Sequence, residues 1–306
     1  MAKNYAFCTC CGAVHPISEM VKTAMPNRGG RNAYMCGQCA KINRSYHATN
    51  TKNQGTAKAN KVFTGTEFET SYTDDFARNV MFEFGFIPTH DCSLESDSYD
   101  NRYMGGWSND GTTCEYVSGI ISGLNMPSKW AVTFEKLIND GHMKVNSSCG
   151  THFHVSIDSM RNANGEQIYM NYIRRFYHSL FVPMCNAMRD NAAATEKLFG
   201  RYFDYHYCLA IDTNTDVSDR YNFINVTNDS NIEFRLNKFK NAKQYQNLMK
   251  FEVEVVKCVI TNFCEHFNDS EIDSRRYPNM TAYRKHKAAV TANKLVKLFE
   301  KYSANI

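Results

Sequence analysis

The chain has 306 residues, of which 43% are hydrophobic and 13% aromatic, so it has enough apolar surface for one large core or a core with a small added module. This composition excludes an intrinsically disordered chain. The formal net charge is +4, but residues 1–60 hold eight Lys and Arg against one acidic residue, a net charge of +7, which leaves −3 for the remainder. The basic character therefore belongs to the N-terminal segment.

The N-terminus shows no apolar segment of the kind that export signals carry, and the longest later apolar stretch is interrupted by Glu254 and Lys257. The twelve cysteines therefore accompany neither an export signal nor a membrane span. Disulfides are rare under these conditions, which favours a reducing environment. We expect a cytoplasmic protein with no membrane partner.

Two Cys-x-x-Cys pairs lie near the N-terminus, Cys8 with Cys11 and Cys36 with Cys39. Four thiolates in two such pairs are the ligand set of tetrahedral structural Zn²⁺. We expect residues 1–44 to form a small zinc ribbon whose fold depends on the metal; reduced cysteines without metal are the less favoured alternative. The basic surplus would suit nucleic acid or an acidic protein as a partner, and a solvated basic surface explains it equally well.

A polar stretch of small residues, 45–60, follows this module and predicts a linker. The rest of the chain, residues 61–306, predicts one α+β body with antiparallel strands. In chain order its elements are a strand at 61–72, a helix at 74–85, strands at 86–94 and 112–118, a helix at 128–139, a strand at 151–158, an aromatic-rich helix at 167–189 kinked at Pro183, strands at 221–227 and 231–237, and helices at 242–267 and 281–302.

Three of the predicted strands carry a pair of polar, chemically versatile side chains separated by one residue. Because residues i and i+2 of a strand point to the same face, each pair presents its two groups side by side. An exposed strand would explain one pair alone, whereas three pairs together indicate one site. Carboxylates with an imidazole suit Mg²⁺ or Mn²⁺, and a nearby arginine suits phosphate. The pairs are Glu67 and Glu69, His152 and His154, and Glu233 and Arg235.

Six short motifs surround these pairs between about residues 61 and 240. They are Gly65-x-Glu67-x-Glu69, Asp91-x-Ser93, Cys114-Glu115-Tyr116-Val117-Ser118, Gly150-x-His152-x-His154-Val155, Arg220-Tyr221-x-x-Ile224-Asn225 and Ile232-Glu233-Phe234-Arg235. Each motif alone is weak, but the six in this order resemble the amidoligase family of glutamine-synthetase-like carboxylate-amine ligases. Two residues, Gly119 and Cys149, depart from those usual in the family. Both lie beside the inferred metal ligands and are not among them.

The resemblance implies a fold and a set of metal ligands. The fold would be a curved antiparallel sheet of glutamine-synthetase-like type packed with helices, and it would bind ATP with two or more Mg²⁺ (or Mn²⁺) ions. Glu69 and Glu115 would hold one ion. Glu67, His152 and Glu233 would hold the other.

The same resemblance implies roles around the phosphate and the substrates. Arg235 would clamp the transferring phosphate, and Arg220 would neutralise phosphate or the substrate carboxylate. Asn225 belongs with these arginines among the expected ATP-binding residues. His154 would face the amine acceptor.

The predicted activity is therefore ATP-dependent ligation of a carboxylate to an amine, with an acyl phosphate as intermediate and a metabolite, peptide or protein as substrate. One alternative is a nucleic-acid-binding or regulatory zinc-ribbon protein with a degenerate ligase body. Another is a metal hydrolase built on the two histidines. It is less favoured because it would leave four residues without a role, namely Glu67, Glu69, Glu233 and Arg235.

Overall fold

The computed structural model describes residues 5–7, 14–24, 32–37, 62–89, 94, 113–157, 160, 169–204, 208–228, 231–267 and 280–304. Near the N-terminus, β1 (Tyr5–Phe7) pairs antiparallel with β2 (Val14–Pro16), and β3 (Val21–Ala24) pairs antiparallel with β4 (Asn32–Met35). The short helix η1 (Ile17–Glu19) lies between the two pairs in the chain.

Of the four expected zinc ligands, the described residues include Cys36, which directly follows β4 and is buried. The other three, Cys8, Cys11 and Cys39, lie outside the described residues, as does the expected linker at 45–60. The zinc ribbon and the linker therefore remain predictions.

One compact unit of the chain comprises Met1–Thr56, Gly65–Ile121 and Val132–Gly150. Most of the long strand β5 (Val62–Thr70) lies in this unit, and it pairs antiparallel with β8 (Cys114–Val117). Strand β8 in turn pairs antiparallel with β7 (Ile87–Thr89). Two shorter strands, β6 (Tyr72–Thr73) and β10 (Met143–Lys144), form a second antiparallel pair. The antiparallel strands expected from the sequence are confirmed here, although β7 and β8 are shorter than predicted.

Helix α2 (Asp75–Glu83) begins and ends where the sequence predicts. Asp74 caps it by accepting a hydrogen bond from the Ala77 amide at 2.8 Å, which satisfies one of the amides left without a partner in the first helical turn. Gly85 follows the helix with φ +84°, a left-handed conformation that costs glycine little. These two residues fix the length of α2 by local chemistry alone.

Both faces of β5 are covered, because Phe63 and Phe68 are buried although they point to opposite sides. Phe68 stacks on Phe134 of α3 (Asn125–Asn139) with ring centroids 4.2 Å apart, and it lies 5.8 Å from the ring of Phe86. A short strand, β9 (Ile121–Ser122), precedes α3 in the chain. The apolar face of β5 is thus anchored in a core, which holds the polar residues of the strand in register.

The other compact unit comprises Ala57–Thr64, Ser122–Ala131 and Thr151–Ile306. Its strands follow the order β12 (Ile224–Asn225), β13 (Ile232–Phe234) and β11 (Thr151–Ile157), and both pairs run antiparallel. Helix α7 (Ala242–Val259) packs on β11, where the ring of Tyr245 meets Phe153 edge to face at 6.5 Å. Phe153, the apolar residue between His152 and His154, therefore faces helix α7, as the strand periodicity predicts.

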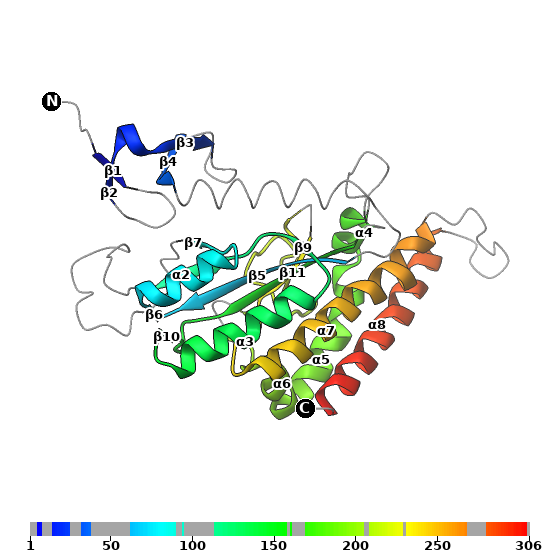
Figure 1. Ribbon diagram of the computed structural model, residues 1–306. Coiled ribbons are helices and arrows are strands. Elements are labelled where there is room, and N and C mark those ends of the chain that lie inside the picture. Colours follow the sequence, from blue (N-terminus) through cyan, green and yellow to red (C-terminus); the bar gives the residue numbers. More distant parts are fainter. Residues whose placement is uncertain are drawn as a thin grey trace. The chain divides into compact units, whose positions relative to one another are not determined.

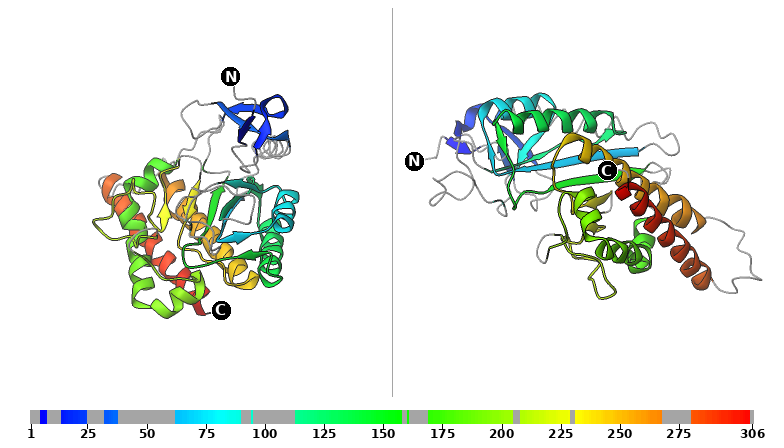
Figure 2. Two further views of the ribbon diagram at one scale, coloured as in Figure 1. Left: turned by 90° about the vertical axis from the view of Figure 1, so that its left-hand side faces the viewer. Right: turned by 90° about the horizontal axis from the view of Figure 1, so that it is seen from below.

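Helices make up the rest of this unit. Helix α8 (Met280–Ala304) packs against both α5 (Tyr177–Asp190) and α7, and the three run alongside one another (Figures 1 and 2). Helix α6 (Ala192–Phe199) contacts α7 and α8 as well. Among the helices of the described ranges, none is both long and apolar enough to cross a membrane.

The sequence predicts one helix at 167–189 with a kink at Pro183, and this prediction places the break at the wrong residue. The segment forms α4 (Met170–Arg175) and α5, which are separated at Phe176, and Pro183 lies within α5. Phe176 leaves helical geometry, with φ −111° and ψ 17°, and its ring packs edge to face against Phe263 at 5.2 Å. Phe263 is distant in sequence, so no local pattern could have shown this contact.

The helix predicted at 242–267 is also divided. Asn241 caps α7 by accepting from the Gln244 amide at 2.8 Å. After Val259 the chain continues as a π-helix (Ile260–Cys264) and then a 3₁₀ turn (Glu265–Phe267). The last predicted helix agrees closely with α8.

Candidate metal and phosphate site

The carboxylate of Glu233 is the centre of the polar residues in the unit that contains β11, β12 and β13. Its Oε1 accepts a hydrogen bond from Arg235 Nη1 at 2.5 Å, and its Oε2 accepts one from Asn225 Nδ2 at 2.7 Å. All three side chains are buried. Charge-assisted hydrogen bonds of this kind are short and strongly directional, so both oxygens of Glu233 are held in a defined orientation.

Strand register explains why these residues meet. Glu233 lies opposite His154 on β11 and opposite Asn225 on β12, and side chains that face each other across paired strands have Cβ atoms about 4.5–5.5 Å apart. Arg235 lies two residues from Glu233 and so points to the same face. The alternation in the sequence and the antiparallel register therefore place one imidazole, one amide, one carboxylate and one guanidinium together.

The two histidines of β11 have different surroundings. His152 is buried, and its Nδ1 lies 3.5 Å from Glu233 Oε1. His154 Nδ1 lies 3.0 Å from Asn231 Oδ1, so a neutral His154 that donates to this oxygen carries its lone pair on Nε2. This is the tautomer in which an imidazole binds a metal through Nε2 while the second nitrogen is held by a hydrogen bond.

Three further carboxylates lie in the unit that contains β7 and β8. Glu67 and Glu69 share one face of β5, and Glu69 lies opposite Glu115 of β8. Glu69 is buried and is bound to Gly150 in two ways, because its Oε2 accepts from the Gly150 amide and its own amide donates to the Gly150 carbonyl at 3.2 Å. A hydrogen bond from a backbone amide thus holds the Glu69 carboxylate in place.

Cys149, which precedes Gly150, is buried beside this carboxylate. Burial raises the pKa of the Cys149 thiol, and the charge of Glu69 raises it further. A thiol with a raised pKa is a poor nucleophile at neutral pH. Cys149 is therefore a buried core residue and not a reactive thiol.

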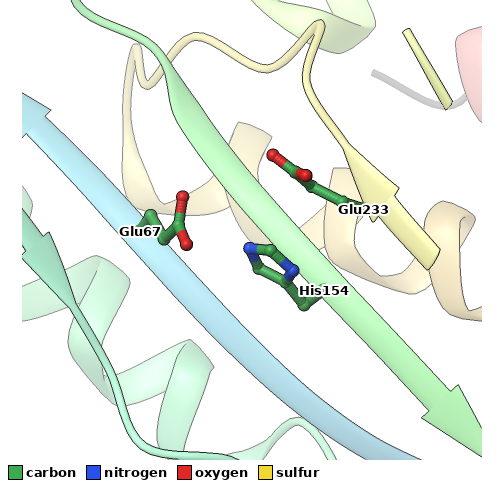
Figure 3. A group of neighbouring side chains, drawn as sticks. All are labelled: Glu67, His154 and Glu233. Carbon is green, nitrogen blue, oxygen red and sulfur yellow. The ribbon is translucent and has the colours of Figure 1, made fainter. Parts of the chain in front are cut away.

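Two groups of three side chains offer metal-ligand atoms that lie within 4.8 Å of one another. One consists of Glu67, His154 and Glu233, and Figure 3 shows these side chains turned toward one another from β5, β11 and β13. The other consists of Glu67, Glu115 and His152. Each group has two carboxylates and one imidazole, a donor set that suits Mg²⁺ or Mn²⁺ better than Zn²⁺.

These groups differ in composition from the sets that the sequence resemblance implied. Glu67 belongs to both groups, and His154 stands with Glu233 where His152 was expected. Glu69, expected beside Glu115, is in neither group. The expected site residues nevertheless gather around Glu67 and Glu233, and no other combination of His, Cys, Asp and Glu in the described ranges meets the same criterion.

Both predicted phosphate-binding arginines lie near one aromatic ring. The guanidinium of Arg220 lies 5.3 Å from the ring centre of Tyr221, and that of Arg235 lies 5.8 Å from it. A guanidinium at this distance over a tyrosine is attracted by the ring. Tyr221 thus orients both cations, of which Arg220 is exposed and Arg235 buried.

Glu252, a fully buried carboxyl on α7, is not among the site residues predicted from the sequence. Burial raises its pKa well above the usual range, and the nearby Asn237 side chain and the charge of His154 offset only part of this effect. A signal was present in the sequence, because Glu252 lies four residues from both Leu248 and Val256 and so shares their apolar face. An acid on the apolar face of a helix marks a buried ionisable group.

No protein-family model matches the chain, and no curated protein matches it in sequence. A cryo-EM structure of glutamine synthetase from Plasmodium falciparum resembles it weakly, with a TM-score of 0.36 and 10% identity over 94% of this chain and 80% of that one. The functional assignment therefore depends on the residues of the site.

Proposed function

We propose that this protein is an ATP-dependent ligase that joins a carboxylate to an amine with the help of divalent cations. The observation that carries the proposal is the pair of ligand groups that share Glu67, each with two carboxylates and one imidazole. Arg235 adds a buried guanidinium in contact with one of the ligand carboxylates, Glu233. Carboxylates, imidazoles and an arginine so close together are suited to Mg²⁺-bound phosphate.

The residues fit such a cation. The ligand atoms are hard oxygens with one nitrogen in each group, and Asn225 and Arg235 hold the oxygens of Glu233 in place. A bound divalent cation would neutralise charge on the phosphates and polarise a phosphoryl oxygen. Until a phosphate binds, the negative charge of Glu233 compensates the positive charge of the buried Arg235 guanidinium.

The chemistry requires activation of the substrate carboxylate, because its oxygen is too poor a leaving group to react with an amine directly. A carboxylate oxygen attacks the γ-phosphorus of ATP, the bond from that phosphorus to the β–γ bridging oxygen breaks, and ADP leaves. The amine then attacks the acyl carbon and phosphate leaves, while the amine gives up a proton. Arg235 and Arg220 supply positive charge for the transferring phosphoryl group, and the leaving phosphate can accept the proton of the amine.

The test is to incubate the full chain with ATP, MgCl₂ and mixtures of amino acids and peptides, and to measure ADP together with new amide masses. We expect ADP release that depends on both an acid and an amine. Glu67→Gln should lower this activity by about 100-fold or more, because it removes a ligand common to both groups. Glu83→Gln, at an exposed position on α2, is the matched control and should leave it unchanged.

Three results would overturn the proposal. One is the absence of ADP release from folded protein with every acid and amine offered. Another is equal activity of the Glu67→Gln and Glu83→Gln variants. The third is stoichiometric Zn²⁺ at Glu67 and His154 with hydrolysis in place of ligation, which would favour a metal hydrolase.

A further inference from the structure

Helix α8 is basic, although the part of the chain to which it belongs is acidic. The helix carries six Lys and Arg residues against one acidic residue, a net charge of +5. Residues 61–306 as a whole have a net charge of −3, so the same residues without α8 have a net charge of −8. One helix of 25 residues therefore holds a strong local excess of positive charge.

Four lysines of α8 lie along one side of the helix. Lys287, Lys294 and Lys301 follow one another at intervals of seven residues, close to two helical turns, and Lys297 follows Lys294 by three residues. We call these four residues the lysine row. At a rise of 1.5 Å per residue the row is about 21 Å long. Buried residues occupy a different side of the helix, namely Ala288, Thr291, Ala292, Leu295 and Phe299.

A groove of about 440 Å³ is lined by α8, by α7 and by the π-helix that follows α7. Helices α7 and α8 run side by side here (Figure 1). Three lysines of the row line the groove, and α7 adds Lys257. Among the described residues that line it, one is acidic, Glu254, and its carboxylate lies 3.7 Å from the Lys257 amino group. The groove therefore has a net charge of +3.

Lys294 is held in place within this groove. Its Nζ donates a hydrogen bond to Asn262 Oδ1, and Asn262 Nδ2 donates to the Cys258 carbonyl at 2.9 Å. Asn262 belongs to the π-helix, and π-helical turns occur frequently at functional sites. A lysine that is already oriented loses less conformational entropy when an anion binds to it than a freely rotating lysine does.

The arrangement of the lysine row destabilises the helix that carries it. Like charges three or four residues apart repel one another, as Lys294 and Lys297 do, and Lys297 and Lys301. The helix dipole favours lysine in the last turn, which applies to Lys301 alone among the four. Surfaces that serve solubility usually mix both signs of charge. The repetition of one sign indicates a polyanionic partner, whose charge would relieve the repulsion.

The neutral residues of this surface indicate which polyanion would bind. Protein–protein interfaces depend on apolar or aromatic anchors, and Val290 is the exposed large hydrophobic residue among the described side chains of α8. Proteins that bind single strands stack the bases on aromatic rings, and the described residues that line the groove include no aromatic side chain. A nucleic-acid duplex requires neither, because its phosphates bind lysines without contacts to the bases.

We propose that the lysine row and Lys257 bind the phosphate backbone of double-stranded nucleic acid without reading its sequence. The ammonium groups would contact phosphates along about 21 Å of the helix and displace the cations bound there. The proposal concerns α7 and α8 and does not depend on the ligase activity proposed above.

The test is fluorescence anisotropy of the full chain with labelled DNA duplexes of about 20 base pairs, at NaCl concentrations from about 50 to about 200 mM. We expect two duplexes of unrelated sequence to bind equally well. Binding should weaken as the salt concentration rises. The logarithm of the association constant should fall with the logarithm of the salt concentration with a slope of about −4, because about four phosphates are neutralised.

Variants then locate the contacts. Glutamine at the three groove positions of the row should make the slope shallower by about 3 and weaken binding at least about tenfold at the lowest salt concentration. Glutamine and lysine have similar helix propensities, so the fold should persist, and circular dichroism checks this. Arginine at the same positions keeps the charge and should preserve binding. The groove variant is Lys294→Gln, Lys297→Gln and Lys301→Gln. The control has the same change in net charge at three exposed lysines outside the groove, Lys129→Gln, Lys136→Gln and Lys197→Gln.

The proposal fails if no duplex binds at the lowest salt concentration, or if the groove variant binds as tightly as the control variant. The second result would place the contacts elsewhere in the chain. If the groove variant does not fold, Lys297→Gln alone decides, with an expected change in slope of about 1. Poly-L-glutamate that binds as tightly as the duplex would also refute the proposal, because the row would then recognise an acidic protein. Loss of binding in the arginine variant would refute the role of charge.

Discussion

A methyl group added at Gly200 would collide with the backbone of another segment of the chain. Gly200 follows α6 with φ +82°, and its amide donates to the Glu196 carbonyl at 2.9 Å. A Cβ added here would lie 2.1 Å from the Lys238 carbonyl oxygen and 3.0 Å from its carbonyl carbon. Both atoms belong to the backbone, so no side-chain rotation can relieve the contact.

The magnitude follows from two effects. A left-handed conformation costs a residue other than glycine about 1–2 kcal/mol, and forcing the backbone apart costs about 1–3 kcal/mol more. Gly200→Ala should therefore lower the free energy of unfolding by about 2–5 kcal/mol. Gly141 is the matched control, because its φ is +82° and an added Cβ would meet no atom within 4 Å. Gly141→Ala should show the conformational cost alone.

Urea unfolding followed by circular dichroism measures both variants, and the m-values show whether they unfold in the same way as the native chain. Gly200→Ala should also disturb the candidate site, because the segment with Lys238 is bonded to the strand that carries the two histidines. Lys238 follows Arg235 by three residues, and the intervening Asn237 carbonyl accepts from the Thr151 amide at 2.9 Å at the start of β11. If Gly200→Ala costs no more than Gly141→Ala, the close approach of Lys238 is not as tight as described, and the reasoning is refuted.

Two further predictions concern ionisable groups. Burial raises the pKa of Asp74, but its contacts with the Ala77 amide and His142 lower it below the ordinary 3.8. Asp74→Ala should cost about 1 kcal/mol at neutral pH. That cost should shrink in unfolding curves as the pH falls below 3.8, because the native carboxylate stays ionised to lower pH than the unfolded one; a constant cost would contradict this. Glu252 has a raised pKa, so the native state keeps a proton that the unfolded chain loses above about 4.5, and stability should fall as the pH rises from there. Glu252→Gln should remove this slope and be the more stable protein at alkaline pH, and an unchanged slope in thermal unfolding would show that Glu252 is not its source.

Local sequence patterns were sufficient for much of the architecture. The alternation in β5, β11 and β13 predicts three strands, and Asp74 and Gly85 predict the ends of α2. These predictions succeed because backbone periodicity and capping depend on residues within one or two turns. The break at Phe176 was not predictable, since it accompanies a ring contact with a residue of a distant helix.

The sequence by itself determined which reactive side chains share a face, because period-2 geometry assigns Glu67 with Glu69, His152 with His154 and Glu233 with Arg235 to common sides of their strands. Only the tertiary structure decided how members of different pairs are grouped. Glu67 joins Glu115 and His152 in one group, and His154 and Glu233 in the other. Strand order and register set these distances, and both arise from contacts between residues far apart in the chain.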